Sequence, residues 1–349
     1  MPFVRNAWHI AAWSHELPTG KALGRTLLGE PVMLFRDAQH GARALSDRCP
    51  HRFAPLHKGD VRDGTVGCPY HGLRFDGTGR CTHNPHGDGR IPAAARVRSF
   101  PAIERHGAVW IWMGDPALAD AGTSLPDFSF IDPEENEVST GYLLTRAHYQ
   151  LSADNLLDLS HFQYLHPETL GSDAIARDPG RVEQRGDTVR SSRRTRAEQL
   201  PAFVARAFGM PDGVRADRHL EVRWDPPGLL AIDVAVCLTG ATHGRVSRSA
   251  HLLTPETDAS THYFFAFGLP KSLGPAARAL VDYAVAGLMV PFRDEDLPML
   301  EAQQAALCGT DFWAQRPVLL PIDAGAIRAR RIIERRIAEE ADEARCESE

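Results

Sequence analysis

Two short pairs of metal-binding side chains dominate the first hundred residues. Cys49-Pro50-His51 and Cys68-Pro69-Tyr70-His71 each place one thiol and one imidazole close together, and sixteen residues separate the two pairs. The close spacing lets the side chains of each pair converge, and the longer separation lets the tips of two hairpins meet. Six cysteines are spread over 349 residues. Because a long cytosolic chain rarely depends on disulfides, this clustering indicates a metal rather than a cross-link.

The order of the ligands distinguishes two kinds of metal centre. A zinc finger pairs Cys with Cys and His with His. Here each loop supplies one Cys and one His, as a Rieske [2Fe–2S] cluster requires, because two thiolates hold one iron and two imidazoles hold the other. Gly67 and Gly72 permit close approach of the backbone to such a cluster. The sequence therefore predicts a Rieske cluster on Cys49, His51, Cys68 and His71.

A third group of possible ligands follows shortly afterwards. Cys81, His83 and His86 lie within six residues of one another. The segment Asn84-Pro-His-Gly-Asp-Gly89 is, however, rich in residues that favour turns. We therefore interpret this stretch as a polar hairpin turn and expect no second metal in it.

Composition narrows the classes of function. Hydrophobic residues make up 43% of the chain and charged residues 24%, which is typical of an ordinary soluble protein. The net charge of −6 argues against nucleic acid as a general partner, because neutralising phosphates requires a basic face. We find no apolar run of about 18 residues that would span a membrane. The first residues lack the pattern of a signal peptide, so we expect a cytoplasmic protein.

The chain divides into two parts with different patterns, as its length allows. Residues 1–115 contain short apolar runs separated by Gly, Pro and Asp, which is typical of an all-β module. A stretch rich in Pro, Asp and Ser at 116–135 indicates a linker. Residues 136–349 predict an α+β domain, an antiparallel sheet with helices. Its expected helices lie near 149–165, 274–289, 295–308 and 324–343, and its strands within 220–238 and 248–269.

Two histidines in the second part indicate a second metal site. His161 and His166 are five residues apart, so on one continuous helix they would not share a face. Pro167 disfavours a helical conformation at His166, so the helix should end just before His166, which then turns back. Asp158 and His161 share a face, and Asn155 lies one turn earlier on the same side.

A carboxylate is needed to complete this second site. Two histidines and one carboxylate on one side of an Fe(II) ion leave positions open for dioxygen, as in the non-haem iron oxygenases. The third ligand is not local, and the best candidate is Asp296, in an acidic cluster with Asp294. On its residues alone, Asp296 followed by Pro298 is more typical of a helix N-terminus than of a metal ligand.

Nearly the whole chain resembles the vanillate O-demethylase oxygenase subunits and the related dicamba-type Rieske monooxygenases. The resemblance implies a Rieske domain followed by a catalytic domain of helix-grip (START-like) fold. It also implies that the aspartate of the Glu-Asp pair ligates iron, which falls on Asp296, with Asp294 as the alternative. The segments that carry the resemblance are Arg5-Asn-Ala-Trp-His-Ile-Ala-Ala-Trp13, both cluster loops, Asp154-Asn-Leu-Leu-Asp-Leu-Ser-His161 with His166 after it, Leu253-Thr-Pro-Glu256, Glu295-Asp-Leu-Pro-Met-Leu-Glu-Ala-Gln-Gln304 and Ile322-Asp-Ala-Gly-Ala-Ile-Arg-Ala-Arg-Arg331.

The same resemblance implies an assembly and further roles. It implies a head-to-tail homotrimer in which the cluster of one subunit faces the iron of its neighbour. Asp158 would bridge the two centres, accepting hydrogen bonds from His71 of the partner subunit and from His161. Asn155, on the same side of the helix, is a further candidate catalytic residue. His251 falls where dicamba-type enzymes present a polar group to substrate, and a buried core histidine is the alternative there.

The implied activity is that of a terminal oxygenase. Electrons from NADH would pass through a separate flavin and iron–sulfur reductase, or a ferredoxin, to the cluster and then to the iron. There O2 would be used to O-demethylate or hydroxylate a small aromatic compound, such as a methoxybenzoate. The alternatives are a Rieske electron carrier, which needs only residues 40–100, and the α subunit of a ring dihydroxylase. The resemblance does not extend to the identity of the substrate.

Overall fold

The structure is a computed structural model that describes residues 3–346, except residues 121, 123, 124, 212, 242 and 310. It forms two compact units. One unit contains residues 3–125 together with 254–257, and the other contains residues 126–253 and 258 onward. The division after residue 125 falls inside the stretch expected to be a linker. The domain limits 1–115 and 136–349 stay predictions.

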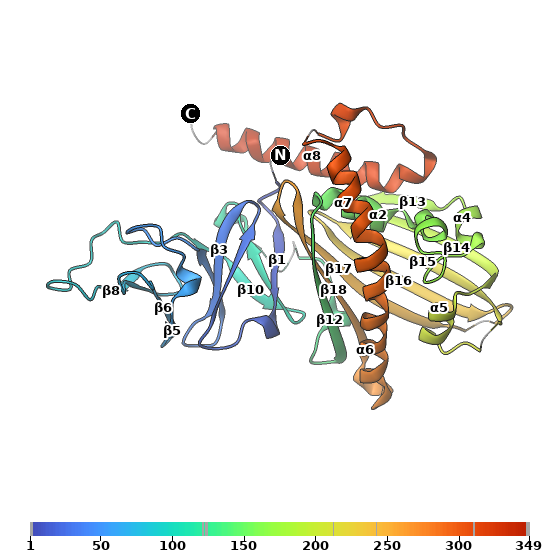
Figure 1. Cartoon of the computed structure of the whole chain (residues 1–349), viewed down its shortest axis with the longest axis horizontal. Coiled ribbons are helices and arrows are strands. Elements are labelled where there is room, and N and C mark those ends of the chain that lie inside the picture. Colours follow the sequence, from blue (N-terminus) through green and yellow to red (C-terminus); the bar gives the residue numbers. More distant parts are fainter. Residues whose placement is uncertain are drawn as a thin grey trace. The chain divides into compact units, whose positions relative to one another are not determined.

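The first unit is built from three small antiparallel sheets, as an all-β module requires (Figure 1). Strands β1 and β11 are buried along their whole length, because their apolar side chains face core on both sides. The second Cys/His loop connects β6 to β7 of the third sheet, and the first Cys/His loop follows β4 of the second sheet. In order across each sheet, the strands are β1 (Trp8–Trp13), β11 (Ala108–Trp112) and β10 (Ala102–Arg105); β2 (Ala22–Leu27), β3 (Glu30–Arg36), β4 (Ala42–Ser46) and β9 (Ser99–Phe100); and β5 (Val61–Arg62), β6 (Thr65–Gly67), β7 (Arg74–Phe75) and β8 (Cys81–His83).

The second unit contains one antiparallel sheet of seven strands. Burial alternates along β15, where every second residue is buried, so one face of this strand lies against the core of the unit. The predicted α+β class, with an antiparallel sheet and helices, is confirmed. In order across the sheet, the strands are β12 (Asn136–Thr145), β18 (Ser260–Pro270), β17 (Arg245–Thr257), β16 (Leu229–Leu238), β15 (Arg215–Asp225), β14 (Thr188–Gln199) and β13 (Arg181–Arg185).

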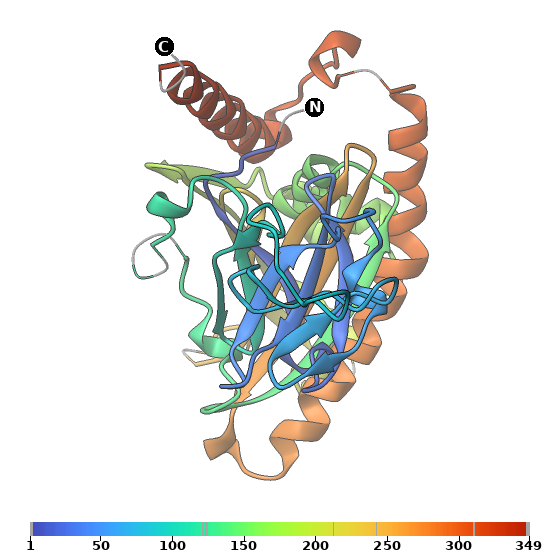
Figure 2. The ribbon, with the colours of Figure 1, turned by 90° about the vertical axis from the view of Figure 1, so that its left-hand side faces the viewer.

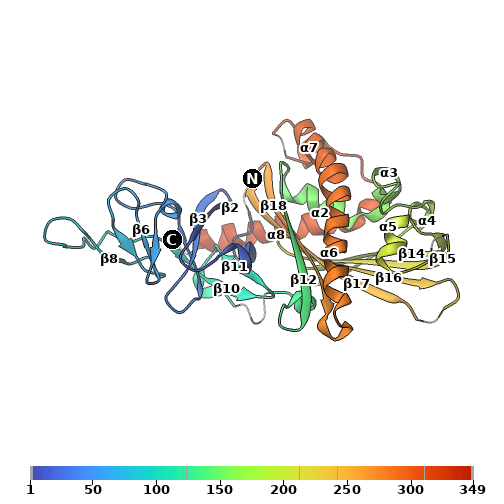
Figure 3. The ribbon, with the colours of Figure 1, turned by 60° about the horizontal axis from the view of Figure 1, so that its bottom comes forward.

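Helices α2, α5 and α6 of this unit lie on the same side of the seven-stranded sheet (Figure 3). Helices α6 and α7 run on as one long helix (Figure 2). No helix in the described part of the chain is long and apolar enough to cross a membrane. The helices are α2 (Tyr149–Leu157), α3 (Phe162–Leu165), α4 (Asp173–Arg177), α5 (Ala202–Ala207), α6 (Ala276–Met289), α7 (Leu297–Ala306) and α8 (Ala324–Cys346).

Two local predictions need correction. The helix expected over 149–165 breaks at Asp158, whose backbone is extended (φ −109°, ψ 95°), and a 3₁₀ turn over Leu159–His161 follows. The position of Asp158 relative to His161 is therefore set by this break and not by a continuous helix. Asp296 directly precedes α7, but its side chain makes no capping hydrogen bond there. It ends a π-helical turn, Val290–Asp296, that joins α6 to α7, and its own backbone is helical.

Candidate metal centres and substrate cavity

The two Cys/His loops of the first unit adopt the same backbone conformation. The N–H groups of Cys49 and Cys68 each donate to the carbonyl oxygen five residues later, at 3.0 and 2.7 Å. Each Cys carbonyl accepts a hydrogen bond from the residue four positions later, Phe53 at 2.9 Å and Gly72 at 3.0 Å. That fourth residue has a positive φ in both loops, 61° and 73°. The loops are thus near copies that present their side chains in equivalent ways, and the left-handed position explains the glycine at 72.

The cysteine and histidine side chains of these loops differ in their exposure to solvent. The Cys49 and Cys68 thiols are buried and free of disulfides, within a cluster of apolar residues. The rings of His51 and His71 lie on the outer side, with centroids 4.6 Å apart. Burial raises the pKa of Cys49 to about 11, and the adjacent Cys68 thiol contributes to the rise. Two neighbouring buried thiols can both ionise only beside a cation, so the pair fits one iron of a cluster and the imidazole pair fits the other.

The hairpin after the second loop supports that loop. The His86 Nε2–H donates to the main-chain oxygen of His71 at 2.8 Å. The Cys81 thiol donates to the main-chain oxygen of His83 at 3.4 Å. The His86 side chain therefore ties the hairpin to the second loop, and the Cys81 thiol is bonded within the hairpin.

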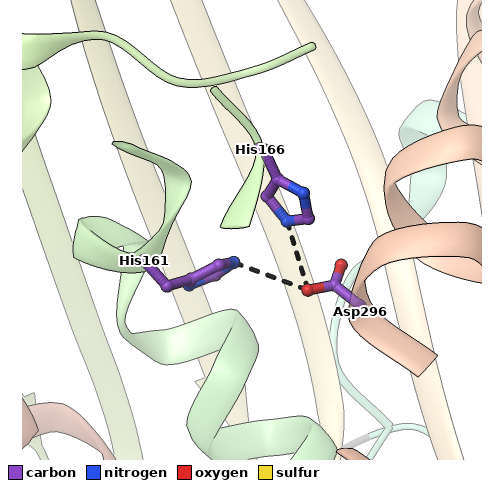
Figure 4. Close-up of side chains that lie close together, drawn as sticks. All are labelled: His161, His166 and Asp296. Carbon is purple, nitrogen blue, oxygen red and sulfur yellow. Dashed lines mark ion pairs between the residues drawn. The ribbon is translucent and has the colours of Figure 1, made fainter. Parts of the chain in front are cut away.

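In the second unit, His161, His166 and Asp296 converge on one point (Figure 4). Nε2 of His161 lies 3.7 Å from Oδ1 of Asp296, and Nε2 of His166 lies 3.1 Å from the same oxygen. One ligand atom from each residue lies within 4.8 Å of the other two. Asp294, the alternative acid, is exposed and pairs with Arg293 at 2.7 Å. The structure thus brings Asp296, and not Asp294, to the two histidines.

The polar atoms at this point fit a metal ion. His166 is fully buried, and its Nε2 makes no hydrogen bond of acceptable geometry although Asp296 is close. Burial lowers the pKa of His161. Burial also opposes charge on His166, but Asp296 and Glu295 outweigh it and raise the pKa of His166. Two imidazole nitrogens and a carboxylate that face one point without mutual hydrogen bonds are the ligand set of a mononuclear non-haem iron.

In both histidines the second ring nitrogen, Nδ1, makes a hydrogen bond that orients the ring. The His166 Nδ1–H donates to Oε2 of Glu295 at 2.6 Å, and Thr169 donates to the same oxygen at 3.0 Å. The His161 Nδ1–H donates to the main-chain oxygen of Asp158 at 2.5 Å. Such partners fix the orientation of an imidazole and turn Nε2 toward the metal. Glu295 was not singled out from the sequence, although it adjoins the candidate ligand.

Asn155 and Asp158 have distinct partners. Asn155 donates from Nδ2 to Oδ1 of Asp296 at 2.9 Å, so it orients the carboxylate of the candidate site. The Asp158 carboxylate accepts hydrogen bonds from the main-chain N–H and the hydroxyl of Ser160, at 2.9 and 2.8 Å. His161 contacts the main-chain oxygen of Asp158 and not its carboxylate, which differs from the expectation. The break in the helix at Asp158 directs the carbonyl group toward His161.

Two family models match the chain. The model of the Rieske [2Fe-2S] domain matches residues 7–101, and that of the vanillate O-demethylase oxygenase C-terminal domain matches residues 145–339, which is more than half of the chain. The chain belongs to the Rieske non-haem iron oxygenases. This confirms the predicted family and the predicted [2Fe–2S] cluster, and it excludes a bare electron carrier.

Close relatives of this oxygenase cover nearly its full length. It is 40% identical over 341 residues to the oxygenase component of dicamba O-demethylase from Stenotrophomonas maltophilia, covering 96% of this chain and 98% of the relative. It is 37% identical over 341 residues to the oxygenase component of chloroacetanilide N-alkylformylase from Rhizorhabdus wittichii, covering 97% of each. A crystal structure of dicamba monooxygenase bound to 3,6-dichlorosalicylic acid matches with a TM-score of 0.90 at 36% identity, over 98% of this chain and 99% of that chain. This chain is therefore the oxygenase component of a multicomponent system.

A cavity of about 600 Å³ lies within the catalytic unit of this oxygenase. His161, Asn155 and Asp296 line it, so the candidate iron site opens into it. Its other walls are mostly apolar and come from the sheet and from α5 and α6. A cavity of this kind admits an apolar organic molecule and limits the access of water to the reacting atoms.

His251 lines this cavity but has no free ring nitrogen. Its Nε2 is hydrogen-bonded to the Ser249 hydroxyl at 2.8 Å, and its Nδ1 to the Tyr263 hydroxyl at 2.7 Å. Burial lowers the pKa of His251 to about 3, so the ring is neutral. The residue expected to meet substrate therefore offers the cavity ring surface and no charge.

Proposed function

We propose that this oxygenase removes a methyl group from an aryl ether, or hydroxylates a small aromatic compound, with O2 and electrons from NADH. In the first reaction, an aryl methyl ether, O2, NADH and a proton give a phenol, formaldehyde, water and NAD⁺. The observation that carries the proposal is the convergence of His161, His166 and Asp296 at the wall of a largely apolar cavity. Two relatives are O-demethylases, one of dicamba and one of vanillate, and their activities support it.

The proposed ligands follow from the two constellations. His161, His166 and Asp296 would hold Fe(II), and Cys49, His51, Cys68 and His71 would hold the [2Fe–2S] cluster. When bound, the iron supplies the oxidising power for cleavage of a C–H bond, and the cluster supplies electrons. The chain's own residues set the geometry. Asn155 fixes one oxygen of Asp296, Glu295 fixes His166, and the apolar walls exclude water around the substrate. We propose that His251 contacts the substrate through its ring.

We also propose the partners that this reaction needs. A flavin and iron–sulfur reductase, or a ferredoxin, would deliver electrons from NADH to the cluster, since the chain is one component of a larger system. The chain would act as a head-to-tail homotrimer. The rings of His51 and His71 lie toward the surface of their unit, where a neighbouring subunit could meet them. Asp158 would then lie between the two centres.

The experiment that tests the function is turnover with a surrogate reductase. The purified oxygenase is supplied with NADH, reductase, O2 and a panel of aryl methyl ethers, from methoxybenzoates to longer methoxyphenyl acids, and formaldehyde and phenol are quantified. We expect formaldehyde in equal amount to the phenol with at least one aryl methyl ether. A cis-diol product would instead show a ring dihydroxylase. NADH consumption without any oxygenated product across methoxylated and unsubstituted aromatics would contradict the proposal.

A further inference from the structure

We propose that Arg245 forms an anion-binding subsite at the end of the cavity that lies away from the iron ligands. The substrate would then be an elongated molecule, with its oxidisable carbon at the iron end, an apolar middle and a carboxylate or sulfonate at Arg245. This inference rests on the proposed function and names the substrate class for the same cavity. Arg245 lines the cavity together with Ser247, Ser249 and His251 of the same strand, β17.

The strand places Arg245 far from the iron ligands. His251 lies at the end of the cavity that holds the candidate iron ligands. Its ring centroid is 5.5 Å from that of Phe292, which belongs to the same π-helical turn as Asp296. Arg245 lies six positions before His251 along the strand, and a strand rises about 3.4 Å per residue, which gives about 20 Å between their Cα atoms. The carboxylate and the methyl carbon of a methoxybenzoate are only one ring apart. Such a small substrate would not reach both ends, even after the length of the arginine side chain is taken into account.

Arg245 is held in position without a carboxylate partner. Its Nη1 donates to the main-chain oxygen of Phe208 at 2.9 Å. A Cβ on Gly209, which has a φ of 56°, would lie 2.2 Å from that Nη1, so the guanidinium packs against bare backbone. Within the part of the chain that the structure describes, no carboxylate oxygen lies within ion-pair distance of Arg245. Its remaining N–H groups are therefore available to an anion, which a guanidinium can bind in a bidentate manner.

The other basic groups of the cavity wall are not available in this way. The guanidinium of Arg218 is buried and forms an ion pair with the buried Glu198, with Nε 3.1 Å from Oε2, and it also donates to the main-chain oxygen of Leu170 at 3.1 Å. His251 is neutral and has both nitrogens bonded. Among the described residues that line the cavity, Arg245 is thus the cation without an anionic partner.

The charge and polarity of the cavity walls indicate at which end an anionic group of the substrate would bind. Asp296 places a carboxylate at the iron end, which disfavours a second anion nearby. Between the ends, Ile232 and Val234 lie opposite Ser249 and Ser247 in the β16–β17 register. Leu280 and Ala284 of α6 also line the cavity. These apolar side chains offer an anion no hydrogen-bond donors, so its most favourable place is at Arg245.

The test compares ligands of increasing length on the iron-loaded, anaerobic oxygenase. Dissociation constants are measured by calorimetry for 4-methoxybenzoate, 4-(4-methoxyphenyl)butanoate and 8-(4-methoxyphenyl)octanoate, and for the primary amide of each. We expect the acid to bind at least about tenfold more tightly than its amide only for the longest ligand, since a hydrogen bond between a guanidinium and a carboxylate is stronger than one to a neutral amide. Arg245→Gln should abolish this acid-to-amide ratio, and Arg245→Lys should retain part of it.

Two further variants separate binding from folding. Arg248, on the same strand, does not line the cavity and pairs with Asp233 at 3.2 Å. Arg248→Gln should leave the acid-to-amide ratio of the octanoate unchanged. Gly209→Ala should displace the Arg245 guanidinium without removing its charge, and should lower the same ratio while the thermal midpoint shows a folded protein.

Three results would overturn the subsite. They are an equal effect of Arg245→Gln and Arg248→Gln, an equal loss of affinity for acid and amide, and a full preference for the acid already present in 4-methoxybenzoate. Binding is measured without turnover. A failure of the proposed oxygenation would therefore leave the binding result standing, and a failure of the subsite would leave the oxygenation assay standing.

Discussion

Arg330 of α8 forms a bidentate ion pair with Asp154 of α2. Its Nε lies 3.1 and 2.9 Å from the two carboxylate oxygens, and its Nη2 donates to one of them at 2.5 Å. The guanidinium also donates to the side chain of Gln150 at 2.9 Å. Asp154 immediately precedes Asn155, which contacts Asp296. The C-terminal helix therefore supports the helix that leads into the candidate iron site, although the sequence alone predicted only that a helix lies near 324–343.

We predict that Arg330→Ala lowers the free energy of unfolding by about 3–5 kcal/mol, because it leaves Asp154 partly buried without its partner. The pair is mostly shielded from water, with 5% of the Arg330 side chain and 23% of the Asp154 side chain exposed. Urea unfolding measures the change. Glu339→Ala is the control, since its pair with Arg335 is about half exposed and should contribute under about 1 kcal/mol. Equal effects of the two variants would show that the Arg330 pair is not important for stability.

Glu295 should control the affinity for iron. It accepts the hydrogen bond from Nδ1 of His166, and such outer partners typically change metal affinity by about 10–100-fold. We expect Glu295→Gln to raise the dissociation constant for Fe(II) within this range and to leave the visible spectrum of the cluster unchanged. Asp294→Asn is the matched control, because Asp294 is exposed and contacts Arg293. Unaltered iron affinity in Glu295→Gln would remove Glu295 from the site.

Asp296 itself should be required for iron. Its carboxylate lies 3.1 Å from His166 and 3.7 Å from His161, and only 7% of its side chain is exposed. We predict that Asp296→Ala loses the mononuclear iron and turnover but keeps the cluster spectrum, and that Asp294→Ala keeps all three. Iron content by mass spectrometry and the visible spectrum distinguish the two variants. Loss of iron in Asp294→Ala, with iron retained in Asp296→Ala, would show that Asp294 is the ligand instead.

The sequence predicted the parts of the sites that are local. The spacing of each Cys/His pair sets its loop, and Pro167 indicates where His166 leaves the helix. Asp296 lies 130 residues from His166, and only the family resemblance connected the two. The π-helical turn that ends at Asp296 could not be predicted from the sequence, because Pro298 and the neighbouring acids are typical of an ordinary helix start. Glu295 was missed for the same reason, since its partner His166 lies 129 residues away.

Some of the fold could not be predicted from the sequence. Strand β14, Thr188–Gln199, is rich in Arg and Ser and shows little apolar alternation. It forms because β13 and β15 pair with its two edges. Arg193 on this strand is buried, and it donates to main-chain oxygens of Ile175 and Asp178. Such partners come from distant segments, so composition predicts an exposed residue where the fold buries one.

The stability of the Rieske unit should fall in mild acid because of His9. Burial lowers the pKa of His9 to about 4, a hydrogen bond to the main-chain oxygen of Val4 opposes this shift, and the charge of Arg5 adds to it. In the unfolded chain the pKa is near 6.5, so the unfolded state binds the extra proton first as the pH falls. The neutral histidine therefore contributes stability above pH 6.5 that is lost between about pH 6.5 and 4. A difference of about 2.5 in pKa corresponds to about 3 kcal/mol.

Urea unfolding between pH 7.5 and 4 measures this effect. His9→Gln can still donate to Val4 but does not titrate, so its stability should fall less steeply than that of the wild type. Parallel curves for the two proteins would exclude His9 as a source of acid sensitivity.

A substitution of Asp158 tests the proposed assembly. Its carboxylate accepts two hydrogen bonds from Ser160 and lies 3.5 Å from Arg193, while its main-chain oxygen holds His161. Asp158→Asn keeps the main-chain contact and one side-chain acceptor but removes the charge. Iron and a reducible cluster should therefore remain. If the charge orients His71 of the partner subunit, transfer between the two centres should slow at least about tenfold, as loss of such a partner commonly does.

A single-turnover experiment makes this visible. The variant is reduced in advance and mixed with substrate and oxygen, and reoxidation of the cluster is followed by its visible absorption. Ser160→Ala is the control, because it removes the hydroxyl that binds the Asp158 carboxylate while the charge stays. Slow reoxidation in Asp158→Asn together with normal reoxidation in Ser160→Ala would assign the effect to the charge. Equal rates in wild type and Asp158→Asn would instead leave the carboxylate only its role as the cap of the 3₁₀ turn Leu159–His161. Sedimentation of the wild type as a monomer would separately contradict transfer between subunits, because no neighbour would then be present to supply the electron.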